Sequence, residues 1–210
     1  MTAAERDRLI EAVLPDVPFD GWSRHALLVA GRRLGLGGDE CAILFPAGAR
    51  DLVAYFSRWA DRQMLPRLSH LDLAQMRVHE RVAAAVMARL DALALHREAV
   101  RRALAILAFP TNAPLGARLL YETVDAIWFA VGDEATDFSF YSKRALLAGI
   151  YAATALYWLD DRSANFAETR AFLDRRLAEV AALPRWRARI EGRLNALPNP
   201  FRAARAMRSR

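Results

Sequence analysis

Residues 21–48 read GWSRHALLVAGRRLGLGGDECAILFPAG, and this stretch carries the first clear structural pattern in the chain. Apolar residues recur with helical spacing on both sides of a glycine-rich break, which predicts a helix over 21–34 and a short helix over 39–45. A Phe-Pro-Ala-Gly segment then precedes a long, aromatic-rich helix predicted over 48–70. Two helices joined by a tight turn and followed by a long helix indicate an all-α fold.

The same periodicity continues along the rest of the chain, and no run of alternating β-branched residues indicates a strand. We therefore expect an all-α bundle of about nine to ten helices, bounded mostly by proline and glycine. The segment Ser163-Ala164-Asn165 offers capping side chains ahead of one of the later helices. The predicted helices cover residues 2–14, 21–34, 39–45, 48–70, 73–95, 97–108, 114–132, 138–160, 164–182 and 184–197.

The positive charge of the chain is concentrated in its last part. The whole chain carries +6, while residues 184–210 hold eight arginines and one acid, a sum of +7, so residues 1–183 sum to −1. A nearly neutral body argues against a nucleic-acid surface spread over the whole protein. The longest uncharged stretch, 145–159, is shorter than the roughly 20 apolar residues that cross a bilayer. Because the amino-terminal residues do not resemble a signal peptide, we expect an intracellular protein.

No catalytic motif is present in the sequence. There is no phosphate-binding loop, nucleophile elbow or dinucleotide fingerprint, the four histidines are scattered, and the single cysteine, Cys41, excludes a zinc cluster and is expected to be buried. We therefore predict no catalytic residue, no cofactor and no metal. Glu122 and Asp125 could share a helix face as an acid–base pair, but ion pairs with Arg118 and Arg144 are the alternative.

Aromatic residues gather between positions 121 and 161. At helical spacing they form stripes that could line an apolar cavity, although a packed core explains any one of them equally well. The predicted cavity residues are Tyr121, Trp128, Phe129, Ile150, Tyr151 and Trp158.

The layout of the first seventy residues resembles the amino-terminal helix-turn-helix of TetR-type regulators. This resemblance implies a TetR-like helical bundle, a homodimer and a ligand cavity in the later helices. DNA binding is not expected, because Asp39 and Glu40 would repel phosphates and the apolar residues of 41–45 cannot read bases. A TetR-type transcriptional regulator with a hydrophobic effector stays open as the alternative function.

A second resemblance is carried by the later part of the chain. Residues 132–145 read GDEATDFSFYSKRA, and they are followed by Ala-Gly-Ile-Tyr at 148–151 and by Phe-x-x-Thr-x-x-Phe-Leu at 166–173. These motifs resemble the signature of the Coq-nine family. The resemblance implies a non-catalytic accessory protein of ubiquinone biosynthesis that binds an isoprenoid lipid or ubiquinone intermediate and assists a demethoxyubiquinone hydroxylase. An enzyme acting on the quinone head group would need a metal or cofactor site that the sequence lacks.

In the Coq-nine family, the Asp-Phe-x-aromatic-Tyr-x-basic-Arg segment contributes to the surface that contacts the hydroxylase. Matched by motif, the resemblance implies partner-binding roles for Asp137, Phe138, Phe140, Tyr141 and Arg144. This chain has Phe140 where the family usually has tryptophan and Lys143 where arginine is common. Both changes could weaken the contact, because phenylalanine has no N–H donor and lysine has no planar fork.

The carboxyl-terminal segment has the pattern of a basic amphipathic helix. An apolar stripe flanked by arginines is suited to anionic lipid head groups, and docking on the body or on a second subunit is the alternative. The predicted membrane-binding residues are Trp186, Arg187, Ile190, Arg193, Leu194 and Leu197. We thus expect a cytoplasmic protein bound peripherally to the inner face of the cytoplasmic membrane. Its parts would be a helix-turn-helix-like unit (1–70), a lipid- and partner-binding bundle (71–183) and a membrane-associating tail (184–210).

Overall fold

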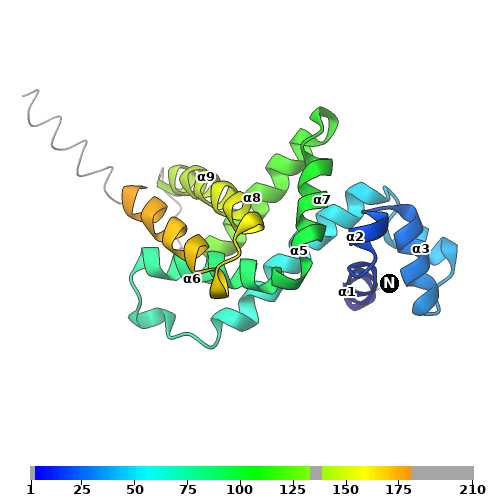
Figure 1. The fold of residues 1–210 in the computed structure, drawn as a ribbon, viewed down its shortest axis with the longest axis horizontal. Coiled ribbons are helices and arrows are strands. Elements are labelled where there is room, and N and C mark those ends of the chain that lie inside the picture. The colour runs from blue at the N-terminus through cyan, green and yellow to red at the C-terminus, as the bar shows by residue number, and fades with distance from the viewer. Residues whose placement is uncertain (1–2, 133–138, 181–210) are drawn as a thin grey trace, which may run out of the picture.

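The computed structural model describes residues 3–132 and 139–180, and all its regular elements in these ranges are helical (Figure 1). The α-helices are α1 (Ala3–Val13), α2 (Val17–Asp20), α3 (Arg24–Arg33), α4 (Gly38–Leu44), α5 (Ala49–Leu68), α6 (Val78–Ala92), α7 (Arg97–Leu107), α8 (Ala113–Ala130) and α9 (Ser139–Asp160). Short 3₁₀ turns are η1 (Leu73–Gln75), η2 (Ala94–His96), η3 (Pro110–Asn112) and η4 (Ala164–Phe166). Residues 167–180 are also helical.

The all-α prediction is confirmed, and two boundaries differ from expectation for physical reasons. The helix predicted over 73–95 begins only at Val78, because the Glu80 carboxylate accepts a hydrogen bond from the Arg77 backbone N–H at 2.7 Å and starts the helix there. The unpredicted α2 contains Pro18 in its first turn, where a proline costs no hydrogen bond. The helix predicted over 184–197 lies outside the described residues.

The long helix α5 connects two groups of helices. In Figure 1, α1, α2 and α3 lie at one end of the molecule, while α6, α8 and α9 lie at the other. Helix α5 packs against α1 on one side and against α6 and α8 on the other. Its buried residues include Phe56, Trp59 and Met64. A single apolar core therefore runs through the described part of the chain.

Two hydrogen bonds join the amino-terminal helices to α7. The Trp22 indole N–H donates to the carbonyl oxygen of Ala99 at 2.9 Å, and the Arg102 guanidinium donates to the carbonyl oxygen of Pro18 at 2.7 Å. The Trp22 ring also packs on Phe56 of α5, with 4.9 Å between ring centroids. The helix-turn-helix-like unit is thus fixed to the rest of the bundle.

None of the helices in the described ranges is, by itself, long and apolar enough to cross a membrane. Two segments, Ala94–Leu107 and Pro110–Ala130, meet the criteria of length and composition only as a pair, and they are bent by 98° relative to each other.

The close contact between α3 and α4 depends on a glycine. Cys41 of α4 is buried, as predicted, and its sulfur lies directly over Gly31 of α3. A Cβ atom on residue 31 would overlap that sulfur. The turn between the two helices therefore requires a glycine at this position as long as residue 41 carries a side chain of this size.

The segment after α9 is held by a single carboxylate. Asp161 accepts hydrogen bonds from the backbone N–H and hydroxyl groups of both Ser163 and Thr169, at 2.6–2.9 Å. The Ser163 hydroxyl accepts in turn from the Glu168 N–H at 3.0 Å, in the first turn of the helix over 167–180, so the capping prediction holds for Ser163. Asn165 lies within η4 instead. These bonds outweigh burial, which on its own would raise the pKa of Asp161, and they lower this pKa from 3.8 to about 2.

We predict that Gly31→Ala destabilises the fold by about 1–3 kcal/mol, the usual cost of overpacking a core. The double variant Gly31→Ala/Cys41→Ala should recover most of this loss, because removing the sulfur makes room for the methyl group. Denaturant unfolding of both variants measures the effect. Equal stability of the wild type and the single variant would contradict the proposed contact.

We predict that acid weakens the fold partly through Asp161. Because the pKa of this group is lower in the folded chain than in the unfolded chain, its contribution is complete above about pH 5 and is lost as pH falls toward 2. Asp161→Ala should cost about 1–2 kcal/mol at neutral pH, like a lost helix cap. It should also reduce the acid dependence of the melting temperature between pH 5 and 2.

Asp160→Ala is the matched control, since the Asp160 side chain is 87% exposed and forms a surface ion pair with Arg101. An identical acid dependence in the wild type and in Asp161→Ala would rule out this role of Asp161.

Candidate functional site

An apolar cavity of about 460 Å³ lies between α5, α6, α7, α8 and α9. Most of its wall is aliphatic. The apolar side chains that line it are Val53, Phe56, Ala60, Leu93, Val100, Ala103, Leu104, Leu107, Ala108, Leu119, Leu120, Ala152, Ala155 and Leu156. Leu156, which is 60% exposed, places part of this wall at the protein surface. The volume and the lining are typical of a site for an apolar small molecule.

Small residues on facing helices leave this space open. Ala103 of α7, Gly116 of α8 and Ala155 of α9 all line the cavity, and each contributes at most a methyl group. The apolar residues of α7 that face the cavity, such as Leu104 and Leu107, are only partly buried. Helix α7 thus turns an apolar face toward a space that the side chains of the described residues do not fill.

One side of the cavity carries a buried polar cluster centred on Arg89 of α6. Its guanidinium donates to the Asp61 carboxylate at 2.7 Å, to Ser57 at 3.2 Å and to the Thr123 hydroxyl at 3.3 Å. It also donates to the Tyr151 hydroxyl. Arg89 is only 5% exposed, so these bonds compensate for the loss of its hydration.

The electrostatics of the cluster keep Tyr151 and Arg89 in their usual protonation states. Burial raises the pKa of the Tyr151 phenol, the Asp61 charge adds to this rise, and the nearby Arg89 charge opposes it. The phenol therefore stays protonated at neutral pH. Burial on its own would lower the pKa of Arg89, but Tyr151 and Asp61 outweigh it, so the guanidinium stays charged.

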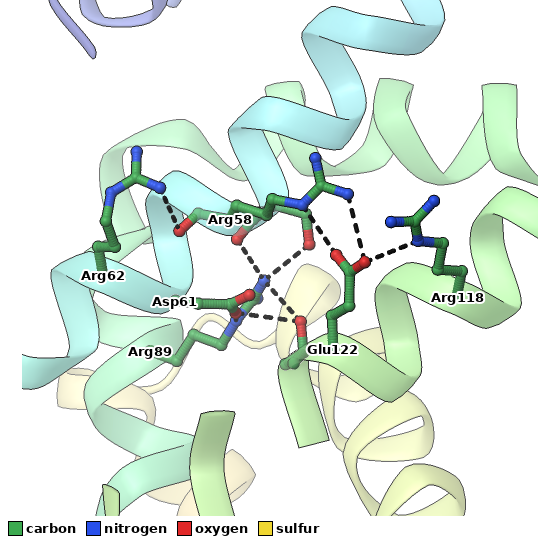
Figure 2. Close-up of polar contacts among 8 residues, drawn as sticks. Arg58, Asp61, Arg62, Arg89, Arg118 and Glu122 are labelled. Carbon is green, nitrogen blue, oxygen red and sulfur yellow. Dashed lines mark hydrogen bonds and ion pairs between the residues drawn. The ribbon is translucent and has the colours of Figure 1, made fainter. Parts of the chain in front are cut away.

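A second ionic cluster lies beside the first, closer to the surface (Figure 2). Glu122 accepts from Arg58 of α5 and from Arg118, one turn earlier on α8, both at 2.8 Å. Asp125 pairs with Arg144 of α9 at 2.8 Å. The two carboxylates predicted as either an acid–base pair or ion-pair partners are therefore both engaged by arginines. The Arg58 bond and the Arg118 bond hold the pKa of Glu122 below its ordinary value.

Of the six predicted cavity residues, only Tyr151 lines this cavity. Trp128, Ile150 and Trp158 are buried in the core, with Trp158 packed against Phe166 and the Arg97 side chain. Tyr121 and Phe129 are 47% and 81% exposed. The space lies further toward α5, α7 and the first half of α8 than the aromatic pattern indicated.

Most of the predicted partner-binding and membrane-binding residues lie outside the part of the chain whose side chains the structure describes. Arg144 is described: its side chain is buried and paired with Asp125. Two of the other predicted partner-binding residues, Asp137 and Phe138, lie outside the described residues. The side chains of the remaining two, Phe140 and Tyr141, are also not described. The same holds for the whole predicted membrane-binding set, Trp186, Arg187, Ile190, Arg193, Leu194 and Leu197.

Apart from Tyr151, the sequence did not single out the residues of the polar cluster. Asp61, Arg89 and Thr123 lie on three helices and are widely separated along the chain. An available signal was the position of each polar side chain on an otherwise apolar helix face, such as Arg89 among Val86, Ala85 and Leu90. A charged residue in that setting has to find a buried partner.

Comparisons with known proteins identify the family. The model of the COQ9 family matches residues 113–184, which include α8 and α9. The chain is 34% identical over 180 residues to the protein named "Ubiquinone biosynthesis protein COQ9, mitochondrial" from Rattus norvegicus, covering 82% of this chain and 57% of that protein. It is 30% identical to the corresponding protein from Schizosaccharomyces pombe, covering 83% of this chain and 69% of that one. The chain thus spans less than two-thirds of the length of the rat relative.

The fold has a solved counterpart. The crystal structure of a TetR transcriptional regulator from Nitrosomonas europaea superposes with a TM-score of 0.68 at 24% identity, over 85% of this chain and 98% of that one. The predicted TetR-like fold is therefore confirmed, and this similarity concerns the fold alone. The relatives and the family model confirm the resemblance first seen in the motifs of the later helices: this chain belongs to the COQ9 family.

Proposed function

We propose that this chain is a non-catalytic accessory protein of ubiquinone biosynthesis, which binds an isoprenoid quinone intermediate and presents it to a membrane-associated hydroxylase. The observation that carries the proposal is the aliphatic cavity between α5, α7, α8 and α9. The relatives are named as ubiquinone biosynthesis proteins. Ubiquinone combines a quinone head with an isoprenoid chain.

The chemistry of the cavity fits such a ligand. An isoprenoid chain has no hydrogen-bonding group, so it gains free energy only by leaving water and packing against apolar side chains. The walls offer leucine, valine and alanine over most of their area. A route to the surface at Leu156 would let a chain longer than the cavity extend outward.

Presentation also needs a membrane and a partner. We assign membrane association to the basic tail, residues 184–210, and contact with the hydroxylase to the segment with Asp137, Phe138, Phe140, Tyr141 and Arg144. Both assignments rest on sequence pattern and family resemblance. A homodimer, as in TetR-type proteins, is part of the same proposal.

The alternative function, a transcriptional regulator with a hydrophobic effector, is opposed by the surface of α4. The exposed side chains of this helix are Asp39, Glu40 and Ile43. The Glu40 carboxylate accepts from the Gly37 N–H at 2.6 Å, so this acid caps its own helix. A helix that offers two carboxylates and an isoleucine has little to donate to phosphates or base edges.

We predict that filling the cavity abolishes lipid binding. Ala152 of α9 lines the cavity, and Ala152→Phe would place a ring in the space that the ligand needs. The dissociation constant for an isoprenoid quinone, measured by titration calorimetry, should rise roughly tenfold or more as apolar contact area is lost. Ala153→Phe is the matched control, because Ala153 is the next residue, is exposed and does not line the cavity.

Wild-type protein that does not bind the quinone would refute the proposed function. Equal affinities of the wild type and Ala152→Phe for the quinone would show that the ligand binds outside this cavity. Binding to duplex DNA that weakens with salt and survives deletion of the tail would favour the regulator instead.

We predict that deletion of residues 184–210 abolishes binding to anionic vesicles, because it removes a charge of +7 and the predicted apolar stripe. Vesicle co-sedimentation measures this, and neutral vesicles serve as the control for the electrostatic part. A truncated chain that still sediments with anionic vesicles would show that another surface binds the membrane.

A further inference from the structure

The polar residues that line the cavity are of one chemical kind. They are Ser57, Arg89, Thr123 and Tyr151, and each carries a hydrogen-bond donor. They come from four helices, α5, α6, α8 and α9, and meet at one place, where the Arg89 guanidinium contacts the other three. The remaining lining residues are apolar or glycine. The cavity therefore has one polar patch in an aliphatic wall.

The direction of the hydrogen bonds leaves donors available to a ligand. A guanidinium has no acceptor, so in the bond between Arg89 and Tyr151 the phenol oxygen must accept. The phenol's own hydrogen is then free to point elsewhere. Among the side chains that the structure describes, in residues 3–132 and 143–180, no contact gives this hydrogen an acceptor. Tyr151 lines the cavity, and its hydroxyl hydrogen is a donor that the described contacts leave unused, polarised by the Arg89 cation that the phenol oxygen contacts.

The negative member of the cluster stands away from the ligand. Asp61 accepts from Arg89 at 2.7 Å and from the Thr123 hydroxyl at 3.0 Å, but it does not line the cavity. Its charge balances that of Arg89, so the patch offers donors without a net positive charge. Such a patch suits a neutral acceptor oxygen, such as a carbonyl or an ether, better than a carboxylate or phosphate.

We propose that the Tyr151 hydroxyl, held in place by Arg89, is the donor of a polar subsite that recognises an acceptor oxygen on the head of an otherwise apolar ligand. This inference rests on the proposed function and adds ligand selectivity to it. The cavity would distinguish an isoprenoid quinone from an isoprenoid hydrocarbon of equal length. Arg89 acts as a positioning residue, because it fixes the phenol oxygen and directs its hydrogen toward the cavity.

The test compares two probes on the full chain by titration calorimetry. One probe is a quinone that carries a three-isoprene chain, and the other is a three-isoprene hydrocarbon without a head. Tyr151→Phe removes the donor and keeps the ring. It should weaken binding of the quinone about five- to tenfold, as expected for the loss of one hydrogen bond, and leave the hydrocarbon's affinity unchanged. Tyr157→Phe is the matched control, since Tyr157 is on the same helix but its hydroxyl contacts Glu168 outside the cavity.

A second variant protects the test from a folding defect. Ser57→Ala removes another donor that lines the cavity, keeps a good helix former and leaves the bond between Arg89 and Asp61 in place. This variant too should weaken binding of the quinone and leave binding of the hydrocarbon unchanged. An unchanged melting temperature of each variant shows that the fold is intact.

The outcomes separate the two proposals. If Tyr151→Phe and Ser57→Ala weaken both probes equally or neither, the subsite is refuted, while binding of both probes to the wild type keeps the cavity proposal. If the wild type binds neither probe, the proposed function fails and the subsite fails with it. A selective loss of quinone affinity supports both.

Discussion

The arrangement of the later helices depends on how the charge of Arg89 is accommodated. Moving a cation out of water costs several kcal/mol unless good partners replace the lost hydration. Here the partners come from α5, α8 and α9. Each bond fixes the axial position and the rotation of its helix relative to α6. A guanidinium has donors in a fixed plane, so it tolerates little variation. One side chain therefore sets the register of four helices.

The hydrogen bonds of Arg89 explain how an aliphatic cavity can exist beside the polar cluster. Helices that contact one another only through apolar side chains tend to close over empty space, because a void loses dispersion contacts. Here the helices are pinned by directional bonds on one side, while Ala103, Gly116 and Ala155 are too small to fill the gap on the other. The cavity and the ion pair are thus parts of one arrangement: rigidity on the polar side permits open space on the apolar side.

Much of the fold could be predicted from the sequence, because helical periodicity and proline or glycine breaks are local signals. The glycine turn before α4, the burial of Cys41 and the cap at Ser163 all follow from neighbouring residues. The cavity could not be located in the same way. Aromatic residues such as Trp128 and Trp158 fill space, so a cluster of them indicates a core, whereas open space occurs where small residues face one another across helices. Which small residues face one another, like the pairing of Arg89 with Asp61, depends on contacts between helices that are distant in the sequence. Residue spacing along the chain does not predict such contacts.

The joint between the amino-terminal helices and α7 has a consequence for how the protein tolerates mutation. Both of its hydrogen bonds run from a side chain, Trp22 or Arg102, to a main-chain carbonyl, at Ala99 or Pro18. Every residue type carries such a carbonyl. The side chain of the acceptor at Pro18, which is only partly buried, can therefore change without breaking its hydrogen bond, provided the backbone keeps its course. Ala99 is 1% exposed, so packing limits the size of its side chain although hydrogen bonding does not. The hydrogen bonds of the joint thus constrain the identity of the two donors and only the backbone of the two acceptors.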